Sequence, residues 1–435
     1  MISSRREFLR TALIGSAVFP LAGKIVPSDL FVSRGPAMGG YLELLDQLEQ
    51  SALEFFWNEA DPHTGLVRDR ARADGGDRAH KSSIAATGFG LTALCIGAQR
   101  GYLSRSELIA RVRKTLRFVA YEMQHVHGFL YHFVDIENGA RLYSCEISPI
   151  DMAILICGAL TCRQYFGDKQ ISRDVETLYR RIEWPWALNG SDTFALSWKP
   201  QSGFSPLHWD GYCESMMLYL LAMGSPTHAV PALSWHKIRR PWLVYGNYRF
   251  ISIRAPLFIH QFSHAWFDFR GKQDEYANYF ENSVIACQAH RQFCQELGDR
   301  YPCYSGKVWG ITASDSPRGY VVWGGPPIQG PIDGTIVPAA AAGSLPFVYS
   351  ESMSVLRNLR SSYGNEIWKR YGFVDAFNPL TGWVSRDVIG IDVGIGMLMA
   401  ENLRSQFVWK TFMGNPEVNV GMERAGFRRV ATGTT

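Results

Sequence analysis

The sequence lacks several features that are typical of zinc-binding, disulfide-bonded or membrane proteins. Its eight cysteines form no C-x-x-C pair, and Cys287, Cys294 and Cys303 are too widely spaced for a zinc pattern. Most of the others fall in or near apolar stretches, so we expect free, buried thiols and no disulfide framework. No segment has an uninterrupted apolar run of about 20 residues, so we expect no stable membrane anchor.

A strong excess of charge is also absent. The formal net charge is +4 at pH 7, and half of it comes from the first ten residues, where Arg5, Arg6 and Arg10 stand against Glu7. The rest of the chain is close to neutral, so neither nucleic acid nor an anionic membrane is an expected partner. A G-x-S-x-G motif between a strand and a helix is missing as well, which leaves serine hydrolase chemistry without support.

The first residues carry a pattern that is typical of export. Arg5 and Arg6 precede Phe8 and Leu9 and then a modest apolar run, TALIGSAVFPLAG. Twin arginines before such a run predict a Tat-type signal peptide, here residues 1–23. The predicted location is periplasmic or secreted. The alternative is a basic terminus without a targeting role.

Long stretches with strand periodicity are absent, and helical periodicity dominates. Smooth helices rich in small residues begin after Ser82 or Ser83 and after Ser148. They alternate with amphipathic helices, one of which opens with the capping-box pair Ser104 and Glu107. A helix that is apolar all round is buried on every side, whereas an amphipathic helix covers others. The alternation predicts an all-α fold, an α/α toroid, and the alternative is an irregular helical bundle.

The predicted domain limits follow from this pattern. A linker is expected at 24–40, a single toroid at 41–430, and a tail at 431–435. Short strands are expected in the loops, near 129–134 and 243–253.

The segment from Phe129 to Leu160 joins an aromatic, carboxylate-bearing loop to one of the smooth helices. Ser148 suits an N-cap, Pro149 suits the first helical position, and Asp151 suits the first turn. A buried helix that begins just after such a loop predicts a pocket at the mouth of the toroid.

Acidic residues recur where the smooth helices begin. Inner helices of a toroid run parallel, so their N-terminal ends are expected to gather at one end. N-capping explains Asp210 and Asp392, but it explains neither Glu146, which lies upstream of its cap, nor Glu214, which is expected one turn inside a helix. Charged groups in apolar surroundings usually have a partner or a role.

Several blocks of sequence between Ser51 and Phe427 carry a family pattern: FFWNEADPHTGLVRDR, SIAATGFGLTALCIGAQRGYLSR, EISPIDMAILICGAL, HWDGYCESMMLYLLAMGSP, FSHAWFDFR, WGITASDSPRGY, IDGTIVPAAAAGSLPF and GIDVGIGMLMAEN. Together they resemble the bacterial glycoamylase-like domain, which includes the β-1,2-glucanases of glycoside hydrolase family 144. The resemblance implies an (α/α)6 barrel that hydrolyses β-1,2-glucan or its oligosaccharides and uses no metal ion or cofactor.

The resemblance also suggests the site residues. Glu146 and Glu214 match carboxylates associated with catalysis, and Asp135 matches a third. Glycoside hydrolysis needs one carboxylic acid and one carboxylate base or nucleophile, and crowding raises the pKa of one member of such a set. The predicted substrate-binding residues are Asp151, His208, Trp209, His264, Trp309 and Asp392.

Other interpretations of these residues remain open. Glu214 could pair with an arginine, Glu146 could bind a sugar hydroxyl, Asp135 could shape a turn, and Asp151 and Asp392 could be caps. His260 and His264 are four residues apart, but no carboxylate lies between them as in H-E-x-x-H, so no metal site is predicted. Family members more often carry Gln after Asp392 and Pro after Gly394, so fine substrate preference stays open.

Alternatives to hydrolysis also remain. A related domain of cyclic β-1,2-glucan synthases acts as a transglycosylase, and a polysaccharide lyase or a non-catalytic carbohydrate-binding protein would be further alternatives. We expect a monomer in which Glu146 and Glu214 face one another across the barrel mouth. A separation of roughly 5–5.5 Å would indicate retention and roughly 6.5–9.5 Å inversion, and the family resemblance favours inversion.

Overall fold

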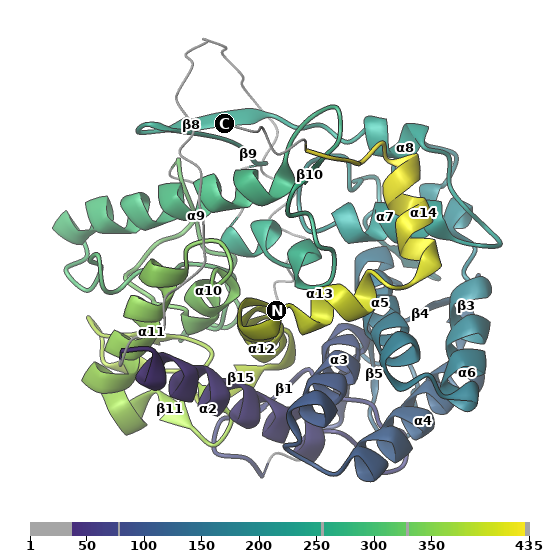
Figure 1. Cartoon of the computed structure of the whole chain (residues 1–435), viewed down its shortest axis with the longest axis horizontal. Helices are drawn as coiled ribbons and strands as arrows, with labels where there is room; N and C mark the ends of the chain where they lie inside the picture. The colour runs from purple at the N-terminus through teal and green to yellow at the C-terminus, as the bar shows by residue number, and fades with distance from the viewer. Residues whose placement is uncertain (1–36, 77–78, 254–255, 328–329, 431–435) are drawn as a thin grey trace.

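The computed structural model describes residues 37–76, 79–253, 256–327 and 330–430. The predicted signal peptide and tail lie outside the described residues, as does the predicted linker up to residue 36. Helix α2 (Ala37–Asn58) begins inside the predicted linker, four residues before the expected start of the toroid at Tyr41. Figure 1 shows that the helices form two concentric layers.

Two layers of helices confirm the predicted all-α fold of the (α/α)6 type. The outer helices are α2, α4 (Arg105–Tyr121), α6 (Lys169–Arg180), α9 (Tyr279–Glu296) and α11 (Tyr349–Tyr363). The inner helices are α3 (Ile84–Arg100), α5 (Pro149–Phe166), α7 (Met216–Gly224), α10 (Pro338–Gly343) and α12 (Gly390–Ser405). One contiguous apolar core runs through both layers.

Two short 3-10 segments, η2 (Leu257–His260) and η3 (Ser263–Ala265), complete the inner ring between α7 and α10. The backbone N–H of Met217 donates to the hydroxyl of Ser263 at 3.0 Å, which ties η3 to α7. On the other side, the amide of Gln261 donates to the carbonyl of Ala340 in α10 at 2.9 Å. The short helices α8 (Leu233–His236), α13 (Phe407–Phe412) and α14 (Pro416–Arg424) are not part of this ring, and α13 lies across one end of it.

The predicted helix signals are confirmed where they are local. The side chain of Ser83 accepts a hydrogen bond from the backbone of Ala86 at the start of α3, and Gly101 ends that helix in the left-handed conformation. Ser104 caps α4, and Ser148 caps α5 with Pro149 at its first position. All eight cysteines are free, and all except Cys303 are buried.

Glycines let neighbouring helices approach closely at two crossings. A Cβ atom at Gly158 of α5 would lie 2.1 Å from the carbonyl oxygen of Gly88 in α3, and one at Gly88 would lie 2.5 Å from that of Ile154. A similar crossing joins α7 to α14, where a Cβ at Gly421 would lie 2.1 Å from the carbonyl oxygen of Leu220. Helix α14 is thereby packed against the C-terminal part of α7.

The strands are short and form antiparallel pairs in the loops. Two pairs lead into inner helices: β2 (Lys81–Ser83) with β5 (Phe133–Asp135), and β1 (Arg70–Arg72) with β15 (Asp387–Ile389). The others are β3 (His125–Val126) with β4 (Phe129–Leu130), β6 (Trp198–Lys199) with β7 (Gly203–Phe204), β8 (Trp242–Tyr245) with β9 (Tyr248–Ile251), β10 (Lys272–Gln273) with β16 (Arg428–Arg429), β11 (Trp368–Lys369) with β12 (Gly372–Phe373), and β13 (Phe377–Asn378) with β14 (Trp383–Val384).

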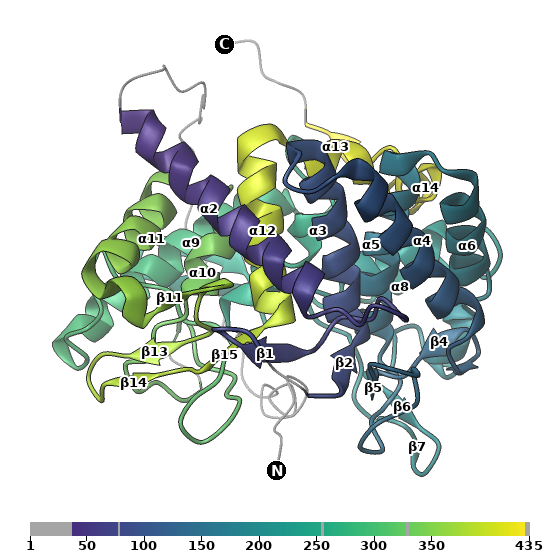
Figure 2. The same ribbon diagram turned by 90° about the horizontal axis from the view of Figure 1, so that it is seen from below.

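Figure 2 shows that the two ends of the toroid differ. Pairs such as β1 with β15 and β6 with β7 gather at one end, while α13 lies at the opposite end. Helices α3 and α12 follow directly after β2 and β15, so both begin at the strand-bearing end. None of the helices in the described part of the chain is both long and apolar enough to span a membrane.

A buried charge cluster ties α2, α3 and α12 together. Glu49 and Glu401 are both 0% exposed. Arg100 lies 2.7 Å from Glu401, and Arg404 forms an ion pair with Glu49. Burial and then the nearby carboxylate of Glu401 raise the pKa of Glu49, and the two arginines offset only part of this increase.

This cluster gives a prediction for the pH dependence of stability. Because the pKa of Glu49 is higher in the folded than in the unfolded state, the unfolded chain loses this proton first as the pH rises, and stability falls. The contribution is about 1.4 kcal/mol for each unit of pKa difference. Glu49→Gln cannot titrate, so its free energy of unfolding should decline less than that of the wild type between about pH 5 and pH 8.

Urea unfolding at several pH values measures this decline. Glu43→Gln, on an exposed turn of the same helix, is the matched control and should keep the wild-type slope. Equal slopes for Glu49→Gln and the wild type would contradict a protonated Glu49 in the folded state.

Candidate active site

The strand-bearing end of the toroid holds a cavity of about 90 Å³. The polar and charged side chains in its lining come from four parts of the chain, which are the segment 69–83, the strand β5 region, the start of α5 and the turn before α7. They include Asp69, Arg70, Lys81, His132, Asp151 and Glu214. The structure thus brings together groups that are up to about 145 residues apart in sequence, as the parallel arrangement of inner helices predicts.

Glu214 is 5% exposed and lines this cavity. It precedes α7 instead of lying one turn inside the helix, because α7 begins only at Met216. The hydroxyl of Ser263 donates to the backbone carbonyl of Glu214 at 2.7 Å and accepts from the N–H of Met217. Segment η3 therefore fixes the turn that carries Glu214.

Asp151 also lines the cavity, in the first turn of α5. Its backbone N–H donates to the side chain of the cap residue Ser148. The cap therefore fixes the position of Asp151 in the cavity wall. One carboxylate oxygen of Asp151 lies 3.6 Å from Nε2 of His132.

Glu146 lies on the far side of His132 from Asp151. Its side chain is 3.1 Å from Nδ1 of His132 and 3.9 Å from Nζ of Lys199. The part of the cavity lining that the structure describes includes His132 and Asp151 but not Glu146. Asp151 and Glu214 thus line one cavity, and Glu146 lies beyond the histidine. The catalytic pairing of Glu146 with Glu214 stays a prediction.

The cationic side chains of the cavity have carboxylate partners. Lys81 lies 2.6 Å from Asp69, and Arg70 lies 2.8 Å from Asp315. Burial alone would raise the pKa of Asp69, but Lys81 and Arg70 outweigh it and lower that pKa. Since these cations are already neutralised, the cavity suits a neutral ligand better than an anionic one.

Aromatic rings and isoleucine side chains provide much of the remaining surface of the cavity. Trp209, one of the predicted substrate-binding residues, lines it together with Phe133, Phe262 and Tyr320. Such rings present apolar faces, on which the C–H faces of a sugar can pack, beside groups that hydrogen-bond its hydroxyls.

Asp392 lies in a second, smaller cavity of about 30 Å³ between α2, α10 and α12. Asp375 lines the same space and accepts a hydrogen bond from the backbone of Asp315 at 2.7 Å. Burial, followed by the carboxylates of Asp392 and Asp315, raises the pKa of Asp375 well above its usual value. Asp392 thus belongs to a buried group of aspartates near Arg70. It is not among the described residues that line the larger cavity.

Three other predicted substrate contacts also lie away from the larger cavity. His264 and Trp309 are both 0% exposed and belong to the core. His264 contacts the hydroxyl of Ser283 at 3.0 Å, and burial lowers its pKa to about 3. His208 is half-buried and hydrogen-bonds the backbone carbonyl of Thr193 at 2.8 Å. Full burial leaves no room for a sugar at His264 or Trp309.

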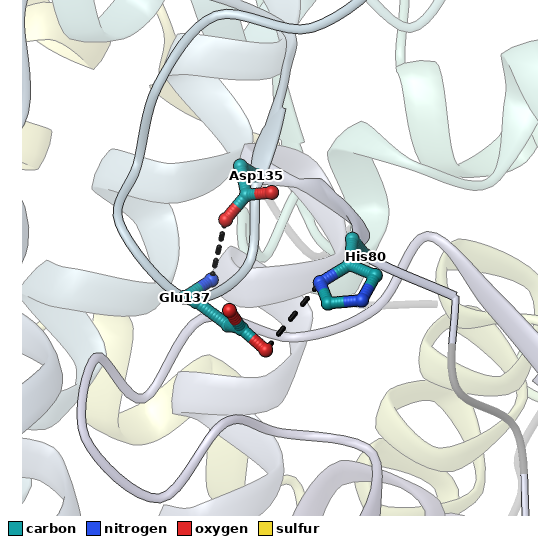
Figure 3. Close-up of side chains that lie close together, drawn as sticks. All are labelled: His80, Asp135 and Glu137. Atoms are coloured by element: carbon teal, nitrogen blue, oxygen red, sulfur yellow. Dashed lines mark hydrogen bonds and ion pairs between the residues drawn. The ribbon is translucent and has the colours of Figure 1, made fainter.

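Asp135, the third predicted catalytic carboxylate, shapes a turn at the end of β5. One of its oxygens accepts from the backbone N–H groups of Glu137 and Asn138. Figure 3 shows it beside His80 and Glu137, and the ligand atoms of the three side chains lie within 4.8 Å of one another. A metal ion could fit between them, but His80 and Glu137 are exposed and lie 3.4 Å apart, a contact that needs no metal.

The sequence interpretation missed Asp69, Lys81, His132 and Tyr320. Asp69 and Lys81 lie in a segment that appears only as a polar loop of mixed charge. One signal was available for Lys81: it directly precedes the serines that start an inner helix, and that helix end was already predicted to face the pocket. His132 lies inside the aromatic loop and becomes a candidate only once the pairing of β2 with β5 is known.

Comparison with known proteins confirms the predicted resemblance. The "Glycoamylase" family model matches residues 206–416. The chain is 28% identical over 423 residues to an exo β-1,2-glucooligosaccharide sophorohydrolase (non-reducing end) of Parabacteroides distasonis. That alignment covers 88% of this chain but only 57% of the relative, so the chain spans little more than half of the relative's length.

Solved structures show the same likeness. An endo-β-1,2-glucanase from Chitinophaga pinensis, in complex with sophorotriose and glucose, is 28% identical with a TM-score of 0.84, covering 89% of this chain and 98% of that one. A β-1,2-glucanase from Parabacteroides distasonis is 26% identical with a TM-score of 0.83, covering 89% and 60%. An endo-β-1,2-glucanase from Talaromyces funiculosus with sophorose is 12% identical with a TM-score of 0.62, covering 89% of both chains, which is a likeness of fold alone.

Proposed function

We propose that this chain is a glycoside hydrolase that cleaves β-1,2-glucan or its oligosaccharides by carboxylate acid/base catalysis. The observation that carries the proposal is the pair of carboxylates, Asp151 and Glu214, in one cavity beside the ring of Trp209. The charge-balanced lining supports a neutral substrate. The names of the relatives, at 26–28% identity over most of this chain, support the β-1,2 linkage.

In this proposal Glu214 is the general acid and Asp151 the general base. The carboxylic acid of Glu214 protonates the glycosidic oxygen as the bond to the anomeric carbon breaks. The carboxylate of Asp151 accepts a proton from the attacking water. Direct attack by water inverts the configuration at the anomeric carbon, so the first product from a β-linked glucan should be an α-anomer.

Product analysis on linear β-1,2-glucan tests the substrate. Chelator-treated protein should release short sophoro-oligosaccharides from this polymer, and should release none from β-1,3-, β-1,4- or α-linked glucans under the same conditions. Proton NMR of the earliest products reads their anomeric form. Cleavage restricted to one of the other linkages would refute the proposed substrate.

The time course separates hydrolysis from transglycosylation. Hydrolysis creates one new reducing end for each bond cleaved, so reducing ends should rise steadily. A constant number of reducing ends with a changing distribution of chain lengths, or with cyclic products, would instead establish a transglycosylase. A bound but unchanged glucan would establish a carbohydrate-binding protein.

We also propose that the chain is exported through the Tat route and acts as a monomer in the periplasm or outside the cell. Arg5 and Arg6 before Phe8 and Leu9 support export, and these residues lie outside the described part of the structure. Replacing both arginines by lysine should leave the precursor in the cytoplasm. Unchanged accumulation of the double variant in the periplasm would contradict this route, and sedimentation of the mature protein measures its oligomeric state.

A further inference from the structure

His132 contacts two carboxylates through its two ring nitrogens. Nδ1 lies 3.1 Å from a carboxylate oxygen of Glu146, and Nε2 lies 3.6 Å from one of Asp151. Only Asp151 has a direct role in the proposed chemistry. The contact with Glu146 therefore needs an explanation of its own.

The backbone fixes the imidazole in this position. The N–H of His132 donates to the carbonyl of Glu146 at 2.9 Å, and its carbonyl accepts from the N–H of Ile84 at the start of α3. The ring stacks on Phe133, with 3.7 Å between the ring centroids. His132 is thus held between the starts of two inner helices, α3 and α5, with little freedom to turn.

Other charged groups near the ring are largely paired. The carboxylate of Asp69, at the start of β1, interacts electrostatically with the His132 ring. It is itself paired with Lys81 of β2 and with Arg70. Lys199 of β6 lies 3.9 Å from Glu146, and Glu214 lines the same cavity from the turn before α7. The two carboxylates that directly contact the ring nitrogens are therefore Glu146 and Asp151.

The contact with Glu146 fixes how the ring is turned. A carboxylate only accepts hydrogen bonds, so Nδ1 donates to Glu146. Nε2 then faces a carboxylate oxygen of Asp151 at 3.6 Å, and the ring that Glu146 holds on one side limits the positions open to Asp151 on the other.

We propose that His132 is a positioning residue: Glu146 orients its imidazole ring, and the ring holds the carboxylate of Asp151 in place. This inference rests on the proposed role of Asp151 as the base. It gives Glu146 an indirect role through His132 in place of direct contact with the substrate. The arrangement resembles other catalytic groups in which a carboxylate fixes a histidine that in turn acts on its neighbour.

The ring signals of His132 test the group without substrate. In protein labelled with ¹⁵N at histidine, these signals are assigned by their loss in His132→Gln. Asp151→Asn and Glu146→Gln each change one partner of the ring, so each should shift the His132 signals. Glu183→Gln removes the carboxylate of the exposed His127–Glu183 pair and should leave His132 unchanged.

His132 signals that neither variant shifts would overturn the inference. This measurement does not depend on which glucan is the substrate. If the chain fails to cleave β-1,2-glucan while His132 still responds to both carboxylates, the proposed function is wrong and the His132 unit stands. The reverse pattern refutes the unit alone.

Activity supplies a second, independent measurement. His132→Gln should lower kcat by about tenfold to hundredfold, as is typical when a supporting hydrogen-bond partner is lost, with a smaller change in KM. Because His132 acts through Asp151, His132→Gln should lower kcat much less in the Asp151→Asn background than in the wild type. Equal losses in the two backgrounds would show a purely structural role and overturn the proposal.

Discussion

Glu214→Gln should lower kcat on linear β-1,2-glucan by about 10²- to 10⁴-fold while changing substrate binding little. Gln keeps the shape of the side chain, and the bonds from the hydroxyl of Ser263 to the turn involve only backbone atoms at this position, so the fold should persist. What the variant loses is the proton that the glycosidic oxygen must receive when the bond breaks. The measurement is steady-state kinetics combined with the affinity for an oligosaccharide.

The leaving group shows whether the lost function is that of the acid. An aryl β-sophoroside with a strongly acidic phenol needs little protonation, so Glu214→Gln should retain much more of its activity on this substrate than on glucan. Glu183→Gln, at an exposed glutamate, is the matched control and should behave as the wild type on both. If Glu214→Gln folds normally and turns over glucan at the wild-type rate, Glu214 is not the acid.

Local sequence patterns correctly predict the start of α5, the helix that carries Asp151. Ser148, Pro149 and Asp151 lie at the cap, the first position and the first turn of α5, as the sequence indicates. These features depend only on residues within one helical turn of each other. The alternation of smooth and amphipathic helices likewise predicts which helices are inner, since the period of the apolar positions is a local property.

The choice among the carboxylates could not be predicted in the same way. Glu146 and Asp151 are five residues apart, and the sequence does not indicate which of them faces the cavity. The structure decides this through His132, whose backbone pairs with Glu146 across a turn and places the imidazole between the two. Such contacts depend on the packing of β2, β5 and two inner helices.

Burial of histidine and tryptophan is equally hard to infer. His264 and Trp309 have side chains that suit sugar contacts, and residue type does not tell whether they are exposed. Their burial follows from contacts with distant segments, such as the hydrogen bond of His264 to Ser283 and the packing of Trp309 near His290. Residue type alone therefore overestimates the number of aromatic substrate contacts.

The second large effect should come from Asp151→Asn. Because Asp151 lines the cavity and Glu146 lies behind His132, kcat should fall by about 10²- to 10⁴-fold in Asp151→Asn and by only about tenfold to hundredfold in Glu146→Gln. Asn keeps the size of the side chain, and the bond from the backbone of residue 151 to Ser148 does not involve the carboxylate, so α5 should still begin at the same place.

The aryl sophoroside separates the base from the acid. A general base acts on water whatever the leaving group is, so Asp151→Asn should lose activity on glucan and on the aryl substrate to a similar extent, unlike Glu214→Gln. The double variant Asp151→Asn, Glu146→Gln should be hardly slower than Asp151→Asn alone, because Glu146 acts through Asp151. A larger loss in Glu146→Gln than in Asp151→Asn would instead identify Glu146 as the base, and would require the loop from 131 to 147 to move when substrate binds.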